Sequence, residues 1–471
     1  MKKAGKWSRE LLYVPVSALI SFMLVKNYDW GVYEFISIFA AFFFFLLVIG
    51  RLGKTIPVRE FAAFVYVLQL LIGALLTYKF YPHIKIGFMA VNEDRYYGYV
   101  MPSLAAFIAG LFIPKFKYTN FDASSLMNGA LFNKAEWIRI GWILIGIGYL
   151  AEILMSVAPS EGLSFIYVLF SFFKFAGLFY VWIAGYKYKW PVTLFIFVPF
   201  AWGSLSNGLF IEVFVWGFFI FAVLQLSKPL KFRTNLLVFA FGIVMIFLLQ
   251  SVKADFRRTA WKTQGELTLS DRLSLWGGLI SNVDLSDPKT RDIANIRFIV
   301  RINQGYIVAS ILRNMPARHD FVDGEYLENE LIGIFVPRFL FPDKAVVGSH
   351  KKFREFAGWN LDERVAMSVS ILGDGYGNFG YWGGIFFCFL NGLLLNFLLH
   401  YCFKLAVRYE RSLILWLPII FTYSVRCGDE FYIITNHIFK SSILIFGVFF
   451  ILRKSGRLAR MARPARKLSI T

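Results

Sequence analysis

"VYEFISIFAAFFFFLLVIG", residues 32–50, is an apolar run with one charged residue, Glu34. As an α-helix, a run of this length crosses the roughly 30 Å hydrocarbon core of a bilayer. Similar runs recur along the 471-residue chain, which is 58% hydrophobic and has a mean hydropathy of +0.58. A soluble protein would show shorter, amphipathic runs. The sequence therefore predicts an all-α, polytopic integral membrane protein.

About twelve spans are expected, and basic residues indicate their orientation. The spans lie near residues 10–25, 32–50, 61–78, 98–114, 138–157, 163–186, 190–206, 208–226, 234–252, 382–402, 411–427 and 437–452. Lys and Arg gather after alternate spans, as at Arg51 and Lys228, and the last span runs into a basic tail. By the positive-inside rule, both termini are predicted to be cytoplasmic. The basic residues behind the net charge of +20 are therefore expected to orient the spans and to contact anionic lipids, and no nucleic-acid partner is expected.

The spans divide the chain into four parts. These are a bundle of about nine spans (1–252), a large outer loop containing helices (253–381), three further spans (382–452) and a basic cytoplasmic tail (453–471). The basic N-terminus lacks a small-residue cleavage site, so it is interpreted as a first membrane anchor. The cysteines, Cys388, Cys402 and Cys427, show no metal-ligand spacing, so three free thiols and no metal are predicted.

The outer loop is rich in cations, although long loops escape the positive-inside rule. These cations are therefore available for chemistry. A short amphipathic element on the bilayer surface is expected over "SDRLSLWGGLISNV", residues 270–283. Asp287 and Pro288 predict the start of a helix that stops near Pro316. One face of that helix carries Arg297, Arg301 and Gln304. The neighbouring residues are apolar, so the arginines are expected to be partly buried with anionic partners; a solvated face is the alternative.

Two further motifs follow in the loop. In "VPRFLFPDK", residues 336–344, prolines frame Arg338 and precede Lys344, which suits a rigid presenting loop. In "GDGYGNFGYWGG", residues 373–384, the glycines predict a turn that leads into the tenth span. Its polar side chains are Asp374, Tyr376 and Asn378.

Charged residues also occur within the predicted spans. Because an ion facing lipid is costly, they should line a cavity or form pairs, and Lys174 is expected to pair with Glu152 or Glu212. "SVRCGDEF", residues 424–431, adds Arg426, Asp429 and Glu430 at the outer end of the eleventh span. An apolar cavity rimmed by Arg and Lys suits a ligand with a lipid tail and an anionic head, since arginine binds phosphate oxygens in a bidentate manner.

The motifs "KADFRRTAW", "RINQ", "VPRFLFPDK" and "GYGNFGYWGG", in this order, resemble the oligosaccharide repeat unit polymerases, the Wzy-type O-antigen polymerase family of bacteria. The resemblance implies a GT-C-like glycosyltransferase of the bacterial inner membrane that needs no metal, cofactor or nucleotide sugar. Its periplasmic site would join undecaprenyl-diphosphate-linked oligosaccharide repeat units into O-antigen, capsule or exopolysaccharide. A chain-length regulator and a flippase would be its protein partners.

The resemblance assigns substrate binding to Arg257, Arg301, Arg338, Lys344, Tyr376 and Asn378. The basic and polar side chains nearby extend this expected set to Arg258, Arg297, Gln304 and Arg426. Fixed cations would stabilise the charge that develops on a diphosphate leaving group. Asp374 and His350 are the candidate general bases, although the family pattern has a glutamate where Asp374 stands.

Three alternatives share parts of this pattern. An O-antigen ligase would use the same lipid donor with a different acceptor. A lipid-linked oligosaccharide flippase would place its cations along the transmembrane path and would need no folded outer loop of this size. A non-catalytic assembly protein is the third alternative.

Overall fold

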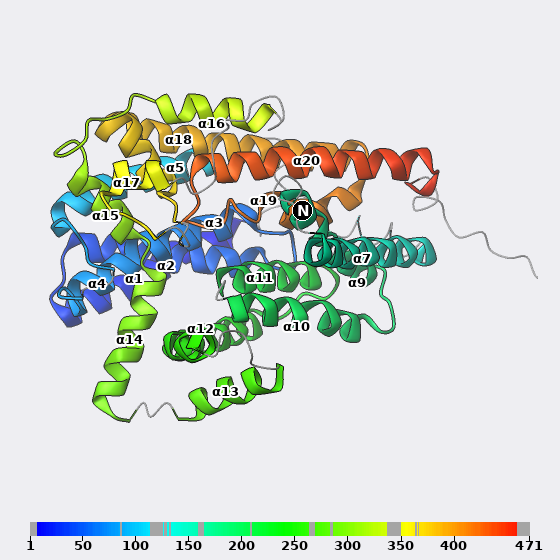
Figure 1. Ribbon diagram of the computed structural model, residues 1–471, viewed down its shortest axis with the longest axis horizontal. Coiled ribbons are helices and arrows are strands. Elements are labelled where there is room, and N and C mark those ends of the chain that lie inside the picture. The colour runs from blue at the N-terminus through cyan, green and yellow to red at the C-terminus, as the bar shows by residue number, and fades with distance from the viewer. Residues whose placement is uncertain are drawn as a thin grey trace, which may run out of the picture.

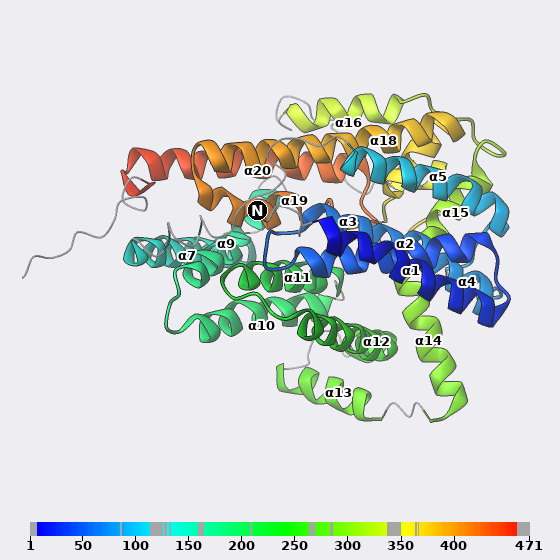
Figure 2. The ribbon, with the colours of Figure 1, turned by 180° about the vertical axis from the view of Figure 1, so that it is seen from behind.

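The computed structural model describes residues 7–84, 87–113, 126, 130, 133–158, 164–207, 210–262, 269–282, 286–336, 350–362, 365 and 367–458. Within these ranges the regular elements are all helical (Figures 1 and 2). The prediction of an all-α fold is confirmed.

The first half of the chain forms the following helices: α1 (Trp7–Tyr28), α2 (Val32–Arg51), α3 (Val58–Val67), the π-helical turn η1 (Leu68–Ile72), α4 (Gly73–Phe80), α5 (Glu93–Phe112), α7 (Lys134–Val157), α8 (Ser164–Ser171), α9 (Phe173–Ile183), α10 (Lys189–Asn207), α11 (Phe210–Ser227) and α12 (Phe232–Lys262). The second half forms α13 (Leu269–Ser281), α14 (Pro288–Ile302), α15 (Gly305–Asn314), α16 (Glu325–Phe335), α17 (His350–Ala357), α18 (Ser370–Arg408), the 3₁₀ helix η2 (Arg411–Trp416), α19 (Leu417–Phe421) and α20 (Phe431–Lys454).

Among the described residues, eight helical segments are long and apolar enough to cross a membrane. They are Glu10–Tyr28, Val32–Arg51, Val58–Phe80, Lys134–Val157, Ser164–Ile183, Phe232–Val252, Ser370–Arg408 and Phe431–Lys454. The other four expected spans coincide with α5, α10, α11 and the short pair η2–α19, which are helical but are not among these eight. The fold is that of a multi-pass membrane protein.

The helices α5 and α18 share the most extensive contact among the described helices and lie side by side in both views (Figures 1 and 2). Gly110 and Gly392 allow this approach, because a Cβ on Gly110 would lie 2.2 Å from the Phe389 carbonyl oxygen. Asn396 Nδ2 also donates to the Gly110 carbonyl over 3.3 Å. Small residues and interhelical hydrogen bonds are the usual means of joining helices in lipid. The pair therefore anchors α18, which carries Asp374, to the bundle.

The predicted helix start at Asp287 is confirmed, since its carboxylate accepts a hydrogen bond of 2.9 Å from the backbone of Thr290. The prediction of one continuous helix is wrong, because the chain breaks between α14 and α15 at Asn303 and Gln304. At the break, the Gln304 backbone N–H donates to the Gln69 carbonyl over 3.0 Å instead of to its own helix. Gln69 lies in the π-helical turn η1, so this hydrogen bond ties the start of α15 to that turn.

The glycine-rich run also differs from the prediction. Residues 373–379 are helical within α18, and the predicted turn is reduced to a kink at Gly380, where φ is +67° and ψ is −156°. Inside this helix, Asn378 Nδ2 donates to the Asp374 backbone carbonyl over 2.8 Å. A non-glycine residue rarely adopts the Gly380 conformation. The first turns of α18 therefore present Asp374 and Asn378 on one face.

Candidate functional site

A buried ionic cluster lies where α16, α17 and α18 meet the start of α20. We define the carboxylate cluster as Lys352 with Glu330, Asp374 and Glu430. Lys352 Nζ lies 2.6 Å from Glu330 Oε1 and 2.9 Å from Asp374 Oδ1. Glu430 Oε2 is 3.5 Å from the same nitrogen. All four side chains are at most 4% exposed. One cation is therefore shared by three carboxyl groups in a dry environment.

Two short helices bring the cation and its nearest partner together. On α16, Glu330 lies on the face that also buries Leu327 and Ile334. On α17, Lys352 lies beside buried Phe353 and Phe356. Each helix thus turns one charged side chain inward with its apolar residues, where an unpaired ion would be very costly. The hydrogen bond of 2.6 Å from Lys352 Nζ to Glu330 Oε1 satisfies both side chains.

The α18 side of the cluster retains hydrogen-bonding capacity. Asp374 is fully buried, and its Oδ1 accepts from Asn378 Nδ2 over 3.0 Å as well as from Lys352. Asp374 Oδ2, Asn378 Oδ1 and Glu330 Oε2 are buried without a hydrogen-bond partner among the described residues. Buried acceptors of this kind are uncommon and call for a donor. The cluster can therefore accept hydrogen bonds from a ligand or hold a proton.

The electrostatics of the cluster favour a bound proton. Burial, reinforced by the charge of Asp374, raises the pKa of Glu330 to about 8. Burial also raises the pKa of Glu430, with a further contribution from Asp374. The three neighbouring carboxylates outweigh the effect of burial on Lys352 and raise the pKa of its ammonium group. At neutral pH the lysine is charged and at least one carboxyl group is protonated.

A second charged group lies beside the cluster in the segment that precedes α20. Arg426 Nε is 3.0 Å from Asp429 Oδ2, and Arg426 Nη1 is 3.7 Å from Glu212 Oε1. Burial raises the pKa of Asp429 to about 6. The Gln304 side chain approaches this segment, since its Oε1 lies 3.3 Å from the position of a Cβ on Gly428.

The structure therefore brings four of the predicted site residues to one region. Asp374 and Asn378 lie in the cluster, and Gln304 and Arg426 lie next to it. Tyr376, on the same helix, has its hydroxyl 3.5 Å from the Met315 carbonyl and packs its ring on other aromatic residues.

Other predicted residues lie elsewhere. Arg297 pairs in a bidentate manner with Asp255 of α12, with N–O distances of 2.7 and 3.2 Å, so this arginine is partly buried and has the expected anionic partner. Arg258 lies 3.9 Å from the same carboxylate and is largely exposed. Arg301 is exposed at the end of α14, so the prediction of a partly buried side chain is wrong there. Arg301 stands in the last turn of α14, one residue before the helix ends at Ile302.

His350 begins α17 and is half-buried, but the side chain that this helix contributes to the cluster is Lys352. The backbone of Arg257 lies in α12, and its side chain is outside the described residues. Arg338 and Lys344 also lie outside the described residues, so the predicted proline-framed loop stays a prediction.

Three cluster residues, Glu330, Lys352 and Glu430, were not among the predicted site residues. The sequence does contain a signal for two of them. In "EYLENELIGIF", residues 325–335, Glu330 falls at helical spacing from Leu327 and Ile334, on the apolar face. Lys352 occupies the corresponding position beside Phe353 and Phe356. A charged residue on the apolar face of a helix indicates a buried partner.

Lys174 and Glu34, two charged residues within the bundle, each have a partner of opposite charge. Lys174 of α9 is buried and forms an ion pair with Glu152 of α7, which decides between the two predicted partners. Glu34 pairs with Lys79 over 2.5 Å and also accepts from the Gly31 backbone. The three cysteines are free thiols, as predicted. In the described ranges, no group of three or more His, Cys, Asp or Glu side chains could hold a metal ion.

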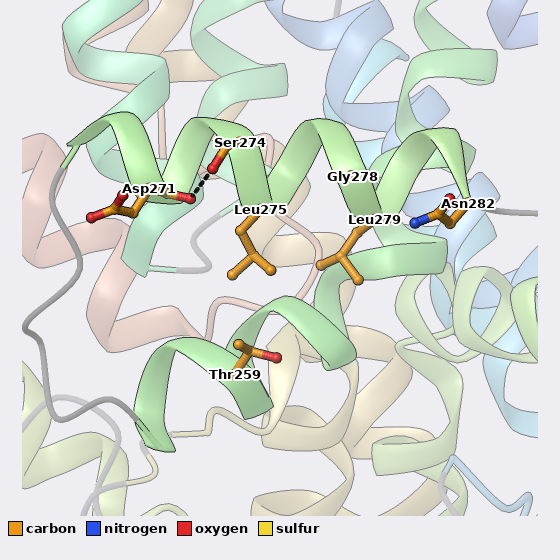
Figure 3. A pocket seen from close by; sticks show the side chains of 7 residues that line it. All are labelled: Thr259, Asp271, Ser274, Leu275, Gly278, Leu279 and Asn282. Carbon is orange, nitrogen blue, oxygen red and sulfur yellow. Dashed lines mark hydrogen bonds between the residues drawn. The ribbon is translucent and has the colours of Figure 1, made fainter.

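A groove of about 440 Å³ lies between α12 and α13, away from the cluster residues (Figure 3). Leu275 and Leu279 of α13 point toward Thr259 of α12, while Asp271 and Asn282 lie at its two ends. The predicted amphipathic element is thus confirmed as a helix. Its Trp276 stacks on Phe256 with ring centroids 4.5 Å apart, so part of its apolar face packs on α12.

The fold and the cluster define an all-α protein with membrane-length helices and a buried lysine–carboxylate centre at the entrance to its last spans. The chain belongs to the family of the domain of unknown function DUF8712, whose model matches residues 97–460. The match begins within α5, extends beyond α20 and includes all four residues of the carboxylate cluster. No curated protein and no solved structure matches the chain.

Proposed function

We propose that this protein is a membrane glycosyltransferase that polymerises undecaprenyl-diphosphate-linked oligosaccharide repeat units into a surface polysaccharide. The observation that carries the proposal is the set of buried acceptor oxygens on Asp374 and Asn378 that lack donors. The hydroxyl groups of a sugar would supply such donors. The order of loop motifs that resembles the oligosaccharide repeat unit polymerases supports the same assignment.

In the proposed reaction, a sugar hydroxyl of the incoming unit attacks the anomeric carbon of the growing glycan. The new glycosidic bond forms as the bond to the lipid diphosphate breaks, and the hydroxyl proton passes to the Asp374 carboxylate. Lys352 holds that carboxylate in place over 2.9 Å. Arg301, Arg338 and Lys344 are proposed to stabilise the charge on the departing diphosphate, which makes a metal ion unnecessary.

The proposed location of the protein is the bacterial inner membrane, and its proposed arrangement is GT-C-like with about twelve spans. Both termini are placed in the cytoplasm and the carboxylate cluster on the periplasmic side. The basic residues that follow alternate spans support this orientation. The proposed protein partners are a chain-length regulator and a flippase.

A deletion strain of the source bacterium tests the proposal. Loss of long polymer with retention of single-repeat glycan on the cell surface is the expected result. Retention of lipid-linked polymer that is not transferred to its final acceptor would instead identify a ligase. Complementation with Asp374→Asn should fail to restore the polymer, while Lys351→Ala, on the exposed face of α17, should restore it.

A flippase is the second candidate, because ion pairs also occur within the bundle. Lys174 pairs with Glu152, and Arg426 of the segment before α20 reaches Glu212 of α11. Charges along a membrane interior are typical of substrate and proton pathways. In the same deletion strain, accumulation of lipid-linked single repeats on the cytoplasmic leaflet would select this function over the polymerase.

A further inference from the structure

Helix α16 belongs to the predicted outer loop, yet it lies along a membrane-length helix. In both views it runs beside α18 and α20, parallel to their length (Figures 1 and 2). At its middle, Glu330 is joined through Lys352 to Glu430, which directly precedes α20. At its end, the ring of Phe335 contacts Phe439 with centroids 4.9 Å apart. The two helices therefore run in the same direction from the level of the carboxylate cluster.

This contact places the end of α16 deep along α20. Phe439 is eight residues beyond Phe431, the first residue of α20, which corresponds to roughly 12 Å at 1.5 Å per residue. The hydrocarbon core is about 30 Å thick, and α20 is long and apolar enough to cross it. If α20 spans the bilayer from its first turn, Phe335 lies well inside the apolar region.

The exposed residues of α16 change character along its length. Its first half exposes Glu325, Glu328 and Asn329. Its second half exposes Leu331 (44%), Ile332 (40%) and Phe335 (62%). A helix that lies on a membrane surface separates polar and apolar residues around its circumference. A separation along the axis is expected of a helix that enters the bilayer by its end.

The apolar end of α16 is continuous with the exposed apolar surface of α20. Residues 431–441 of α20 are buried or half-buried, and exposure begins at Ser442 and Ile443. Beyond that point α20 exposes Ile443, Phe446 and Phe450. The last turns of α16 thus extend the exposed apolar surface of α20, which acyl chains would cover in a membrane.

We propose that α16 is a membrane-inserted half-helix whose last turns contact the acyl chains of the bilayer. Its buried face, with Glu330, then forms the wall between the carboxylate cluster and the lipid. The proposal rests on packing and polarity alone and does not depend on glycosyl transfer.

Spin labels at single cysteines test the insertion in the full chain, reconstituted in phosphatidylcholine vesicles. In a background with Cys388, Cys402 and Cys427 replaced by serine, labels are placed by Ile332→Cys and Phe335→Cys. Glu328→Cys is the matched aqueous control and Ile443→Cys the lipid control. The measured quantity is the ratio of a label's collision rate with oxygen to its collision rate with a water-soluble nickel chelate. This ratio is expected to be several-fold higher at 332 and 335 than at 328, and similar to the ratio at 443. A ratio at 332 and 335 equal to that at 328 would overturn the proposal.

A second measurement keeps the native cysteines. The fluorescence that each variant adds to that of the parent chain is measured for Phe335→Trp and for Glu328→Trp. Lipids brominated in the middle of their acyl chains should quench the fluorescence added by Phe335→Trp several-fold more than that added by Glu328→Trp. Equal quenching of the two added tryptophans would contradict insertion.

Discussion

The Lys352 ammonium donates a hydrogen bond of 2.6 Å to Glu330 Oε1, and this contact joins α16 to α17. The same ammonium holds Asp374 of α18 and Glu430 at the start of α20. Lys352 therefore attaches α16 and α17 to the start of α18 and to the segment that precedes α20.

Removing the Lys352 charge should strongly destabilise the protein. Lys352→Met leaves three buried carboxyl groups without their cation, and breaking a buried pair typically costs about 3–5 kcal/mol. The free energy of unfolding is measured by denaturant titration of the protein in detergent. Lys351→Met is the matched control, because its side chain is 69% exposed, and it should change stability by less than about 0.5 kcal/mol. Equal stabilities of the two variants would show that the cluster is not formed.

Stability should fall as pH rises through the neutral range. The unfolded chain loses the Glu330 proton near the ordinary pKa of 4.5, while the folded protein keeps it until about pH 8. Between these values the unfolded state binds fewer protons, so the folded state is favoured less at higher pH. The midpoint of unfolding measured from pH 5 to 8 should show this decline.

Glu330→Gln tests the origin of this pH dependence. Glutamine can still accept from Lys352, but it cannot titrate, so the decline should become shallower. A residual slope is expected from Glu430 and Asp429, whose pKa values are also raised by burial. An unchanged slope would assign the pH dependence to other groups.

The partner of Lys174 can be identified by double-mutant cycles. Lys174→Met combined with Glu152→Gln should show a coupling free energy of about 0.5–3 kcal/mol, because the two side chains form an ion pair. The cycle of Lys174 with Glu212 should be additive, since Glu212 pairs with Arg426. Coupling in the second cycle alone would contradict the structure.

Two arginines of α14 should differ in their roles. Arg297→Gln breaks the bidentate pair with Asp255 and should lower the amount of folded protein. Arg301→Gln, at an exposed site, should leave the protein level unchanged. If Arg301 binds the leaving diphosphate, its loss should reduce polymer formation about a hundredfold. Arg338→Ala should act in the same way. The protein level on gels measures the effect on folding, and the polymer length on gels measures the effect on polymer formation. Normal polymer from both Arg301→Gln and Arg338→Ala would contradict the proposed diphosphate site.

Cysteine labelling should place the cluster and the end of α20 on opposite sides of the membrane. A membrane-impermeant maleimide should label Lys351→Cys in cells whose outer membrane alone is permeable. Lys454→Cys should react only after the inner membrane is opened, because it ends the last membrane-length helix. The reverse pattern would invert the proposed topology.

Much of the architecture was predictable because it depends on local sequence. Apolar runs such as residues 32–50 predict membrane-length helices from composition and length alone. The start of α14 was predictable from Asp287 and Pro288. The Asp287 side chain accepts a hydrogen bond from a free backbone N–H group at the helix end, and Pro288 has no N–H group there that would need a partner. In contrast, the break at Gln304 depends on a hydrogen bond to Gln69, a residue distant in the sequence.

The candidate site was predictable only in part. Asp374 and Asn378 were predicted site residues, and their i, i+4 spacing brings them together on one helix. The other three residues of the carboxylate cluster come from three other segments, and sequence spacing does not report which buried charges meet. By itself, the sequence determined the helical class, the positions of eight membrane-length helices and the presence of unusual charges, because hydrophobic length and backbone capping act locally. Only the tertiary structure decided that Lys352, Glu330, Asp374 and Glu430 form one buried centre, because burial makes each of these charges costly until packing supplies its counter-ion.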